Sequence, residues 1–539
     1  MDVFINLFSF LWLIRNVKFV LFWIYLWQLK EYHTGRFADH FRTYKGKQIF
    51  VSPLPILKVI LIVALLANYS FFNIVFWALL LVYAVESAVF ILGIKQKSIK
   101  RPAFTFKAVL LTLIAIALTL AYLFALQTYI TSMFWLLFLL LAFDLLMPAI
   151  ISLVVLAVQP FFVFARYRIL DQARQKVLEH KNLTIIGITG SYGKTSSKEF
   201  LTTILSSKFS VLSTPEHKNS EMGIAQTILQ SLTPDHKFFI VEMGAYNKGG
   251  IDLLCNMARP DIGIVTGVNE QHLSTFGSLE NLLSAEGGRE LARNLPAHGI
   301  LIVNGDNAYC VDLYKNFKGN KRIYTSKENM VSADMWAEHI EVKPTYLDFI
   351  LVSRQRNMAH CRVNVLGKHN IQNVLGAMMA AKELGMGIQE ITRACETITQ
   401  QQGGMVLKKG VHGITVIDSS YSANPDGVVA DVDYLNVHAN KKVIVMPCLI
   451  ELGKESNRIH EELGKKIAQV CDLAIITTKD KFRQLETGFM SQGLNSRKML
   501  FCDDAQEIFN VITTFCGQGD TVLLEGRVPG ELLTLLYDR

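Results

Sequence analysis

Residues 185–196 read Ile-Ile-Gly-Ile-Thr-Gly-Ser-Tyr-Gly-Lys-Thr-Ser, and the interpretation of the whole chain starts from them. The β-branched run predicts a strand, the glycines predict a turn, and Lys194 begins a segment of helical composition. Such a turn lets main-chain N–H groups surround a phosphate at a helix N-terminus. Lys194 can reach the terminal phosphates of ATP, and the Thr195 hydroxyl can bind Mg²⁺. The sequence therefore predicts an ATP site formed by Gly190, Ser191, Gly193, Lys194, Thr195 and Ser196.

An ordinary connection between a strand and a helix is the alternative, because glycine-rich turns are common. The full Walker pattern also expects a glycine where this chain has Ile188. The position of Gly193-Lys194-Thr195, directly between a predicted strand and a predicted helix, favours phosphate binding.

The composition divides the chain into two parts. Its 539 residues allow about three domains at roughly 150 residues each. Residues up to about 164 are dominated by Leu, Phe, Val, Ile, Ala and Trp, whereas residues beyond 166 have the mixed composition of a soluble α/β protein. The net charge of +8 could indicate nucleic-acid binding, but the basic residues of the first half cluster beside apolar segments, where they face lipid headgroups. We therefore predict a protein of the cell membrane that contacts lipid and binds no nucleic acid.

The cysteines indicate the compartment of the second part. All eight lie at or beyond Cys255, without a C-x-x-C pair. Zinc ribbons and disulfide frameworks need closer patterning, so we expect reduced structural thiols in the cytosol.

Five apolar segments are candidates for membrane-spanning helices, which need about 20 residues each. They cover residues 4–29, 54–69, 71–94, 106–126 and 130–158. Segments 30–52, 95–107 and 166–176 are rich in Lys and Arg, which predicts a multi-pass protein with its N-terminus outside and its catalytic domains in the cytoplasm. If residues 4–29 lie in the interface instead, four spans remain and the catalytic domains stay cytoplasmic. Asp144 is either a functional residue within a span or part of a helix break near Pro148.

The predicted order is a transmembrane region of four to five helices at 1–165, a basic linker or helix at 166–182, a central ATP-binding domain at 183–400 and a C-terminal domain at 401–539. In both domains, short β-branched runs alternate with helical stretches; the runs are 211–212, 238–241, 262–265, 299–303, 414–417, 443–446, 473–477 and 521–524. This rhythm is typical of parallel sheets covered by helices. The predicted fold class is α/β, with a P-loop-type central domain and a smaller doubly wound, Rossmann-like C-terminal domain behind an all-α transmembrane region.

Further polar residues follow predicted strands, where open α/β sheets place their ligands. Glu242 is a candidate magnesium ligand or a solvated glutamate at a strand end, and His272 is a candidate site residue or an ordinary loop residue. His369, Asn370 and Asn373 share one face at helical spacing, which could meet a purine or face water. The stretch Asp418-Ser419-Ser420-Tyr421-Ser422-Ala423-Asn424-Pro425 could contact a ligand or form an ordinary turn.

Taken in order, these motifs resemble the Mur ligase family, and most closely its D-alanyl-D-alanine-adding branch. The resemblance rests on Thr189 to Thr195 with Lys198-Glu199, Glu242-Met243-Gly244-Ala245, His272-Leu273 before Phe276-Gly277-Ser278, Gly367 to Asn373, Asp418 to Pro425, and Glu451-Leu452-Gly453 before His460. It covers about Leu183 to the C-terminus. Members of this branch complete the peptide of the peptidoglycan precursor.

The resemblance implies an ATP-dependent ligase that forms an acyl phosphate and then an amide. Lys194, Glu242 and His272 would be catalytic, with magnesium held by Thr195, Glu242 and His272. By the same resemblance, His369 and Asn373 would contact the adenine side, Asp418 the ribose, and Tyr421 and Asn424 the substrate. The partners would be a UDP- or lipid-linked muropeptide and an amino acid or dipeptide such as D-Ala-D-Ala.

Three departures from the family pattern shape the hypotheses. Members commonly carry a carbamylated lysine in the stretch corresponding to 281–290, where this chain has none, and we hypothesise that Glu286 supplies the carboxylate, with Glu290 as the next candidate. The family's arginine is missing from Gly403-Gly404-Met405, and Glu525-Gly526-Arg527 stands where the branch tends to have Lys-Gly-Ser-Arg. Membrane segments replace the domain that grips the uridine nucleotide, which suggests a membrane-linked acceptor or a nucleotide held by another subunit.

Two other functions stay open on the sequence. One is a poly-γ-glutamate synthase-like membrane ligase, which also joins a membrane segment to a Mur-type core. The other is a membrane scaffold that binds ATP without catalysis, which the missing lysine and arginine favour.

Overall fold

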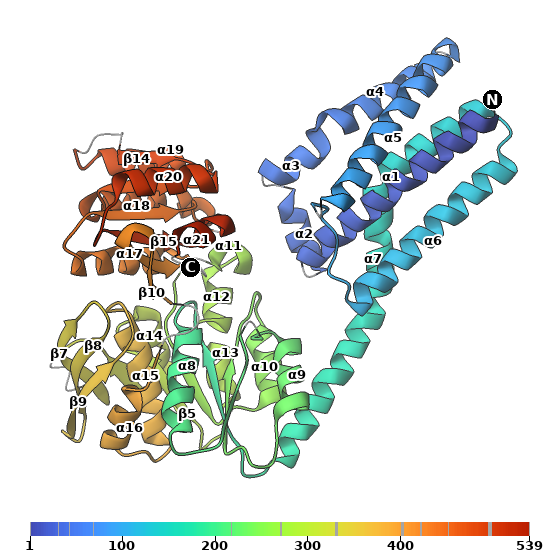
Figure 1. Cartoon of the computed structure of the whole chain (residues 1–539). Coiled ribbons are helices and arrows are strands. Elements are labelled where there is room, and N and C mark those ends of the chain that lie inside the picture. The colour runs from blue at the N-terminus through green and yellow to red at the C-terminus, as the bar shows by residue number, and fades with distance from the viewer. Residues whose placement is uncertain are drawn as a thin grey trace. The chain divides into compact units, whose positions relative to one another are not determined.

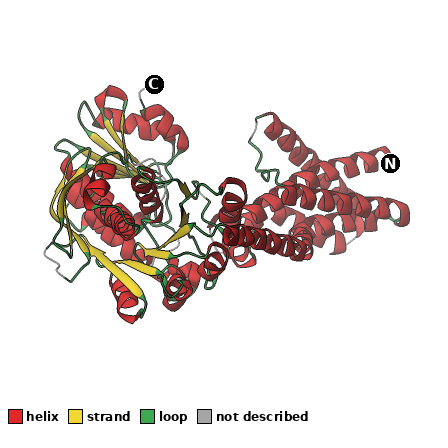
Figure 2. Cartoon of the chain, turned by 90° about the horizontal axis from the view of Figure 1, so that it is seen from below, coloured by secondary structure: helices red, strands yellow, loops and turns green. Residues whose placement is uncertain are grey.

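The computed structural model describes residues 2–30, 32–41, 44–67, 69–96, 98–216, 218–269, 272–328, 332–399, 404–420, 423–450, 452–493 and 498–537. The chain forms two compact units, a helical unit at Met1–Tyr167 and an α/β unit at Arg168–Arg539. The helical unit is coloured blue to cyan in Figure 1, and its described residues contain helices without strands, as Figure 2 shows.

The described part of the helical unit consists of α1 (Asp2–Leu29), α2 (Thr34–His40), α3 (Tyr44–Val51), α4 (Pro53–Ala67), α5 (Phe72–Lys95), α6 (Phe106–Tyr129) and the first part of α7 (Met133–Glu179). Four of them, α1, α5, α6 and α7, are long and apolar enough to cross a membrane. The helix α4 is apolar but has only 15 residues. At 1.5 Å per residue it is about 22 Å long, against about 30 Å of hydrocarbon. The described residues of the five predicted apolar segments are therefore mostly helical. Four of these helices are long enough to cross a membrane, and the helix in the segment predicted at 54–69 is shorter than the hydrocarbon layer.

The helix α7 is continuous across the boundary between the two units. It runs through the predicted last span and through the predicted basic linker despite Pro148 and Pro160. Near its end, Leu170, Ala173 and Val177 belong to the apolar core of the α/β unit. Most of the segment predicted as a linker or helix is thus a packed helix that ends at Glu179.

Four charged side chains, three of them buried and one half-buried, form an ion network inside the helical unit, one from each of four helices. Arg15 on α1 pairs with Asp144 on α7, and its Nε lies 3.4 Å from Oε2 of Glu86 on α5. The Nζ of Lys58 on α4 lies 2.6 Å from Glu86 and 2.9 Å from Asp144. The hydroxyl of Tyr83 also donates to Asp144, at 3.2 Å. Asp144 therefore lies in an unbroken helix and holds other helices, so the helix-break interpretation is wrong.

The larger sheet of the α/β unit has nine described strands in the order β2-β3-β1-β4-β5-β6-β7-β8-β9. Their bounds are β1 (Thr184–Thr189), β2 (Val211–Ser213), β3 (Phe238–Glu242), β4 (Ile262–Val265), β5 (Ile300–Asn304), β6 (Asn320–Thr325), β7 (Met335–Val342), β8 (Leu347–Ser353) and β9 (Met358–Val363). All neighbours from β2 to β7 are parallel, and β7, β8 and β9 pair antiparallel. The sequence predicted the parallel strands β1 to β5 and missed β6 and the antiparallel extension.

Helices cover both faces of this sheet, as the rhythm of the sequence predicted. One face packs on α8 (Lys194–Ser206), α15 (Asn370–Glu383) and α16 (Ile388–Cys395). The other face packs on the end of α7 and on α9 (Glu221–Ser231), α10 (Gly250–Ala258), α12 (Leu279–Ala285), α13 (Arg289–Asn294) and α14 (Ala308–Asn316), and the short helix α11 (Leu273–Phe276) lies nearby.

The smaller sheet forms the C-terminal domain, in orange to red in Figure 1. Its described strands follow the order β10-β11-β15-β12-β13-β14, and all pairs are parallel except β10 with β11. They are β10 (Val406–Lys409), β11 (Thr415–Ser419), β12 (Lys442–Met446), β13 (Leu473–Ile476), β14 (Met499–Phe501) and β15 (Thr521–Glu525), covered by α17 (Pro425–Tyr434), α18 (Ser456–Val470), α19 (Phe482–Met490), α20 (Ala505–Phe515) and α21 (Gly530–Leu536). The predicted doubly wound domain is confirmed.

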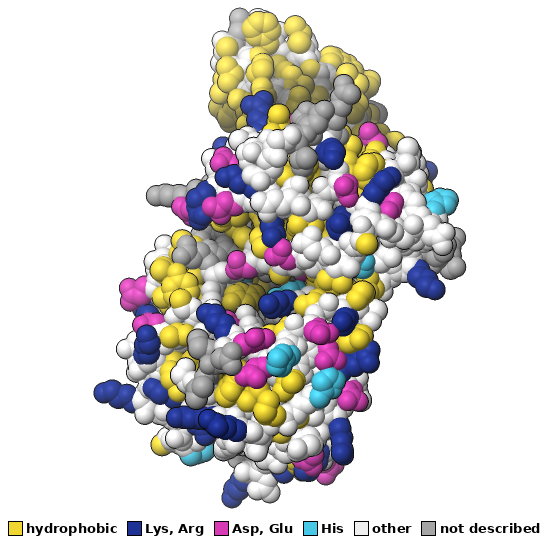
Figure 3. Space-filling view, turned by 90° about the vertical axis from the view of Figure 1, so that its left-hand side faces the viewer, with side chains coloured by type: hydrophobic (Ala, Val, Ile, Leu, Met, Phe, Trp, Pro, Cys, Tyr) yellow, Lys and Arg dark blue, Asp and Glu magenta, His cyan; other side chains and the backbone are white. Residues whose placement is uncertain are grey.

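The surfaces of the two units differ in character. Apolar side chains gather on the helical unit, which is the yellow body at the top of Figure 3, whereas the visible face of the α/β unit intersperses Lys and Arg with Asp and Glu. Many large apolar residues of α4, α5 and α6 are exposed, including Ile60, Leu81 and Phe124. Such a surface suits lipid contact rather than water.

Candidate active site

The loop between β1 and α8 has the geometry of a phosphate-binding turn. Gly190 and Gly193 have φ angles of +146° and +74°, which favour glycine. A side chain at Gly190 would collide with Thr266, and one at Gly193 with Asn373. The N–H of Ser191 donates to the carbonyl of Gly267 at 2.8 Å, which ties the loop to the segment after β4. The backbone of the predicted ATP site is therefore held from outside the motif.

Lys194 is the first residue of α8 and bends back over the loop. Its Nζ donates to the carbonyl of Gly190 and lies 3.5 Å from that of Ser191. The partial positive charge of the helix N-terminus points at the same place. Ser196, the last residue of the predicted set, is buried in the first turn of α8.

Glu242 ends β3, which lies next to β1 in the sheet, and its carboxylate faces the start of α8. Its Oε1 accepts hydrogen bonds from Thr195 Oγ1 at 3.0 Å and from Asn219 Nδ2 at 3.1 Å, and its Oε2 lies 3.1 Å from Lys198 Nζ. Glu242 is buried, so the interpretation of a solvated strand end is wrong. The structure brings together two predicted metal ligands, Thr195 and Glu242.

Glu286 lies on the other side of the loop, beside His272. Its two oxygens contact Ser191 Oγ at 2.7 Å and His272 Nδ1 at 2.9 Å. Burial acts to raise the pKa of Glu286, but the hydrogen bond from His272 and the charges of Lys194 and His272 hold that pKa below its usual value. Glu286 is thus an ionised, buried carboxylate beside the phosphate loop. The hypothesis that Glu286 replaces the carbamylated lysine of the family requires such a group.

Glu290 has a structural role instead. Its carboxylate accepts hydrogen bonds from the main-chain N–H groups of Gly249 and Asp252, at 2.8 and 3.1 Å, and from Ser284 Oγ at 2.9 Å. These contacts cap the start of α10. The structure therefore favours Glu286 over Glu290 as the site carboxylate.

The predicted metal ligands separate into two pairs, Thr195 with Glu242 and His272 with Glu286. Among the described residues, no group of three or more His, Cys, Asp or Glu side chains could hold one metal ion. Magnesium commonly binds through one or two carboxylates, substrate phosphates and water. Each pair contributes one carboxylate, from Glu242 or from Glu286, beside the phosphate loop. This arrangement fits magnesium binding through carboxylates, substrate phosphates and water.

His369 and Asn373 lie at the start of α15, and Asn373 faces the same loop. Asn373 is the residue that a side chain at Gly193 would strike, and its Nδ2 donates to Asn370 Oδ1 at 3.0 Å. Burial lowers the pKa of His369, although the negative charge of Asp431 acts to raise it. The face predicted at 369, 370 and 373 is mostly buried rather than wet.

The predicted site residues of the C-terminal domain make their hydrogen bonds within that domain. Asp418 Oδ2 contacts Lys408 Nζ at 2.9 Å and accepts from the Tyr537 hydroxyl at 2.6 Å, while Oδ1 accepts from Ser420. Burial opposes ionisation, but these hydrogen bonds lower the pKa of Asp418. Asn424 caps α17 by accepting from Gly427 N at 2.9 Å, and Tyr421 lies outside the described residues.

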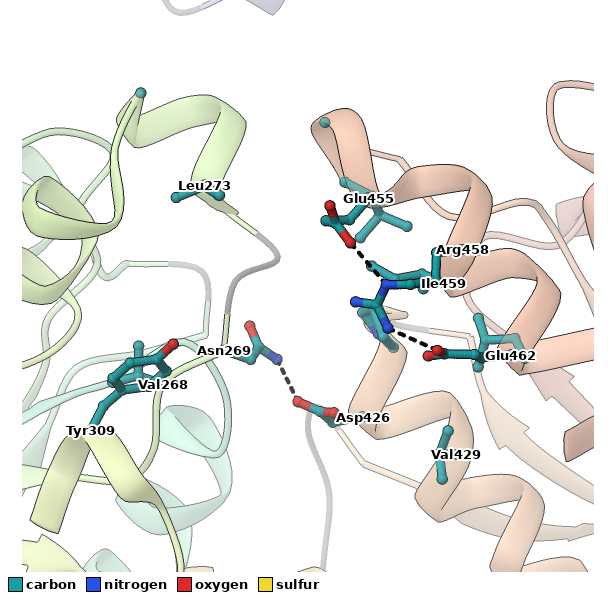
Figure 4. A pocket seen from close by; sticks show the side chains of 15 residues that line it. Val268, Asn269, Leu273, Tyr309, Asp426, Val429, Glu455, Arg458, Ile459 and Glu462 are labelled. Atoms are coloured by element: carbon teal, nitrogen blue, oxygen red, sulfur yellow. Dashed lines mark hydrogen bonds and ion pairs between the residues drawn. The ribbon is translucent and has the colours of Figure 1, made fainter.

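A cleft of about 880 Å³ separates the central and C-terminal domains within the α/β unit. Figure 4 shows Asn269, Leu273 and Tyr309 on one wall and Asp426, Arg458 and Glu462 on the other. Asn269 Nδ2 donates to Asp426 Oδ2 at 3.0 Å across it. Because Leu273 adjoins His272, and the carbonyl of Asn269 accepts from Ser191 Oγ at 3.4 Å, the cleft opens beside the loop.

Comparison with known families identifies this architecture. Residues 188–381 match the Mur ligase middle domain, and residues 405–528 match the family described as Mur ligase, glutamate ligase domain. The chain belongs to the Mur ligase family. The predicted resemblance is therefore confirmed.

Individual Mur ligases are similar over the same region. The UDP-N-acetylmuramoyl-tripeptide--D-alanyl-D-alanine ligase of Escherichia coli is 30% identical over 285 residues, which is 52% of this chain and 61% of that enzyme. Its namesake from Mycobacterium tuberculosis H37Rv is 29% identical, covering 58% of this chain and 62% of that enzyme. The chain thus spans about three fifths of the length of these relatives.

Solved structures agree in fold. MurF from Acinetobacter baumannii matches with a TM-score of 0.62 and 25% identity, over 69% of this chain and 79% of that one. MurF ligase from Thermotoga maritima, solved in complex with ADP, matches with a TM-score of 0.60 at 23% identity, over 69% of this chain and 83% of that one.

Several residues at this Mur ligase site were missed from the sequence. Asn219, Lys198 and Thr214 surround Glu242, with Thr214 Oγ1 accepting from the Glu242 N–H at 3.0 Å. Lys408 and Tyr537 hold Asp418. Lys198 was visible at one helical turn from Lys194, whereas Asn219 and Tyr537 reach the site only through the tertiary fold.

Proposed function

We propose that the chain is an ATP-dependent, ADP-forming ligase of peptidoglycan precursor synthesis. It joins a muropeptide carboxylate to D-alanyl-D-alanine or a similar amine. The observation that carries this proposal is the convergence of Lys194, Thr195–Glu242 and His272–Glu286 at the ends of neighbouring strands beside one cleft. The names of the relatives support the substrate class.

The proposed chemistry has two steps. A carboxylate oxygen of the acceptor attacks the γ-phosphorus of ATP, the bond to ADP breaks, and an acyl phosphate forms. The amine nitrogen then attacks the acyl carbon and forms the C–N bond, the bond between the acyl carbon and the phosphate oxygen breaks, inorganic phosphate leaves with that oxygen, and the nitrogen loses a proton. The sum is ATP plus carboxylate plus amine giving ADP, phosphate and amide.

The residues of the loop serve this chemistry by position and charge. Main-chain N–H groups of the loop and Lys194 bind the phosphates of ATP and neutralise the charge on the transferred group. Asn373 borders the same loop. Asn373 and His369, both at the start of α15, are proposed to contact the adenine side, and Asp418 is proposed to contact the ribose. Thr195 with Glu242 and His272 with Glu286 would hold magnesium, which would polarise the phosphoryl oxygens as a Lewis acid.

The test is phosphate release by the purified full-length protein in detergent. Release is expected only when ATP, a UDP-linked or lipid-linked muropeptide and D-Ala-D-Ala are all present, and Lys194→Ala should abolish it. A matched control is Lys208→Ala, because Lys208 lies just beyond the same helix in an exposed pair with Glu390. Release that depends on glutamate instead would favour the poly-γ-glutamate-type function, and ATP binding without turnover would favour the scaffold.

We also propose that the acceptor is membrane-linked, because a helical unit with helices of transmembrane length stands before the ligase domains. The lipid-linked muropeptide is then turned over faster than the soluble UDP-linked one. Equal turnover of both would contradict this part of the proposal without affecting the ligase activity.

The proposed location is the cell membrane, with five crossings and the ligase domains in the cytoplasm. In this proposal α4 is the short crossing: Lys58, Leu61 and Leu65 are its buried residues, while exposed apolar residues such as Ile60 face lipid. A cysteine introduced at Ser132 should react with a membrane-impermeant maleimide in intact cells, whereas one at Ser98 should not. The eight natural cysteines are buried, which keeps the background low. Labelling at Ser98 would contradict the topology.

A further inference from the structure

Lys198 is a buried cation that pairs with Glu242. It lies three residues after Thr195 on α8, so both side chains project from the same face of the helix toward β3. Its side chain is 4% exposed, and its Nζ lies 3.1 Å from Glu242 Oε2, whose side chain is 7% exposed. Burying an ammonium group costs several kcal/mol unless a partner compensates it. The carboxylate of Glu242 therefore provides the compensation that the buried ammonium group of Lys198 needs.

Glu242 is held by donors on both oxygens. Thr195 Oγ1 and Asn219 Nδ2 occupy Oε1, and Lys198 occupies Oε2. Asn219 is itself fixed, because its carbonyl accepts from Gly244 N at 3.0 Å. The carboxylate is thus fixed in direction, and its charge is already compensated within the protein.

We propose that Lys198 is the resident counter-ion of Glu242, a positioning residue that keeps divalent cations out of this position until nucleotide phosphates accompany them. This inference rests on the proposed function, because it assumes an ATP-dependent, magnesium-using site. Lys194 and Lys198 balance Glu242 and Glu286, so these four charges around the loop sum to zero. A free divalent cation gains little there, whereas the negative phosphates of ATP attract it.

The test removes the ammonium group and measures metal binding without nucleotide. Lys198→Met keeps the length of the side chain and leaves Glu242 uncompensated. Binding of Mn²⁺ alone, measured by electron paramagnetic resonance on the full-length protein, should become at least about tenfold tighter than in the wild type. Mg²⁺ alone should raise the Tm of this variant by several degrees and leave the wild-type Tm unchanged, because the metal replaces the missing counter-ion.

Two controls isolate the charge. Lys198→Arg keeps the cation and should bind Mn²⁺ as the wild type does. Lys208→Met removes a lysine near the same helix whose pair with Glu390 is exposed, so its Tm should stay insensitive to Mg²⁺. If Lys198→Met does not fold, the double variant Lys198→Met/Glu242→Gln removes both charges and should fold. It should then bind less Mn²⁺ with ATP than the wild type, because the pair of Thr195 with Glu242 is lost while His272 with Glu286 remains.

The outcomes separate this inference from the proposed function. Tight Mn²⁺ binding to the wild type without nucleotide, or no gain in Lys198→Met, would overturn the role of Lys198. Unchanged Mn²⁺ binding with ATP in the double variant would also overturn it. Failure of the wild type to bind a fluorescent ATP analogue would instead refute the proposed function.

Discussion

The ion network of the helical unit predicts a large and specific effect of Asp144→Asn. Asp144 is the common partner of Arg15, Lys58 and Tyr83. The asparagine is nearly the same size, so the substitution changes charge rather than packing. It leaves two cations facing Glu86 alone, with one uncompensated charge among apolar helices. Removing one partner of a buried pair costs about 3–5 kcal/mol, and we expect Asp144→Asn to destabilise the helical unit by that amount.

A second substitution should restore most of this loss. Adding Lys58→Met to Asp144→Asn removes the surplus cation and leaves Arg15 with Glu86, whose Nε and Oε2 are 3.4 Å apart. The two changes are therefore non-additive, with a coupling free energy of about 2 kcal/mol or more. The assay is thermal unfolding of the full-length protein in detergent, followed by the fluorescence of the buried tryptophans Trp12 and Trp23.

Two results would refute this reasoning. One is a Tm of Asp144→Asn equal to that of the wild type, which would mean that water or lipid headgroups compensate the charges. The other is simple additivity of Asp144→Asn and Lys58→Met. Ser132→Cys, on the exposed connection before α7, is the matched control and should leave the Tm unchanged.

Three further predictions concern the α/β unit. Glu286→Gln should lower ligase turnover at least about 100-fold while the protein stays folded, whereas Glu290→Gln should lower the Tm and spare turnover per folded molecule; steady-state kinetics with circular dichroism distinguishes them. Gly193→Ala should reduce binding of a fluorescent ATP analogue at least about tenfold, because φ of +74° strains alanine, and unchanged affinity would contradict the loop geometry. Burial and the neighbouring Asp431 raise the pKa of Glu525 well above its usual value. The folded state therefore binds a proton that the unfolded chain releases, and the free energy of unfolding should fall as the pH rises above about 5. Glu525→Gln should flatten that slope in a series of Tm measurements, and an unchanged slope would exclude Glu525 as its source.

The strand ends of the site were predictable because they follow from local patterns. Each β-branched run was visible, and parallel strands place their carboxyl ends at one edge of the sheet. The positions of Gly190–Lys194, Glu242 and His272 at that edge therefore followed from the sequence. The antiparallel strands β7 and β9 were missed because polar and charged residues, such as Glu338 and Glu341 in β7, interrupt their apolar positions. The strand β8 contains the apolar run 349–352 and could have been recognised from the sequence.

Other features depend on tertiary contacts that no local pattern contains. Glu286 and Glu290 are the same residue type four positions apart, yet Gly288, with φ of +78°, separates α12 from α13 and turns Glu290 toward α10. Lys198 was visible in the sequence only as part of the family motif with Glu199, and its pairing with Glu242 depends on the position of β3. Asp144 had no partner within reach along α7, because Arg15 and Lys58 come from other helices.

The most direct test of the proposed ligase activity follows the oxygen of the acceptor carboxylate. The muropeptide is labelled with ¹⁸O in its terminal carboxylate and incubated with the full-length protein, ATP and D-Ala-D-Ala. Activation through an acyl phosphate moves one labelled oxygen into each inorganic phosphate formed, and mass spectrometry of the phosphate should detect it in step with amide formation. Amide formation with unlabelled phosphate, or phosphate release without amide, would contradict the proposed reaction.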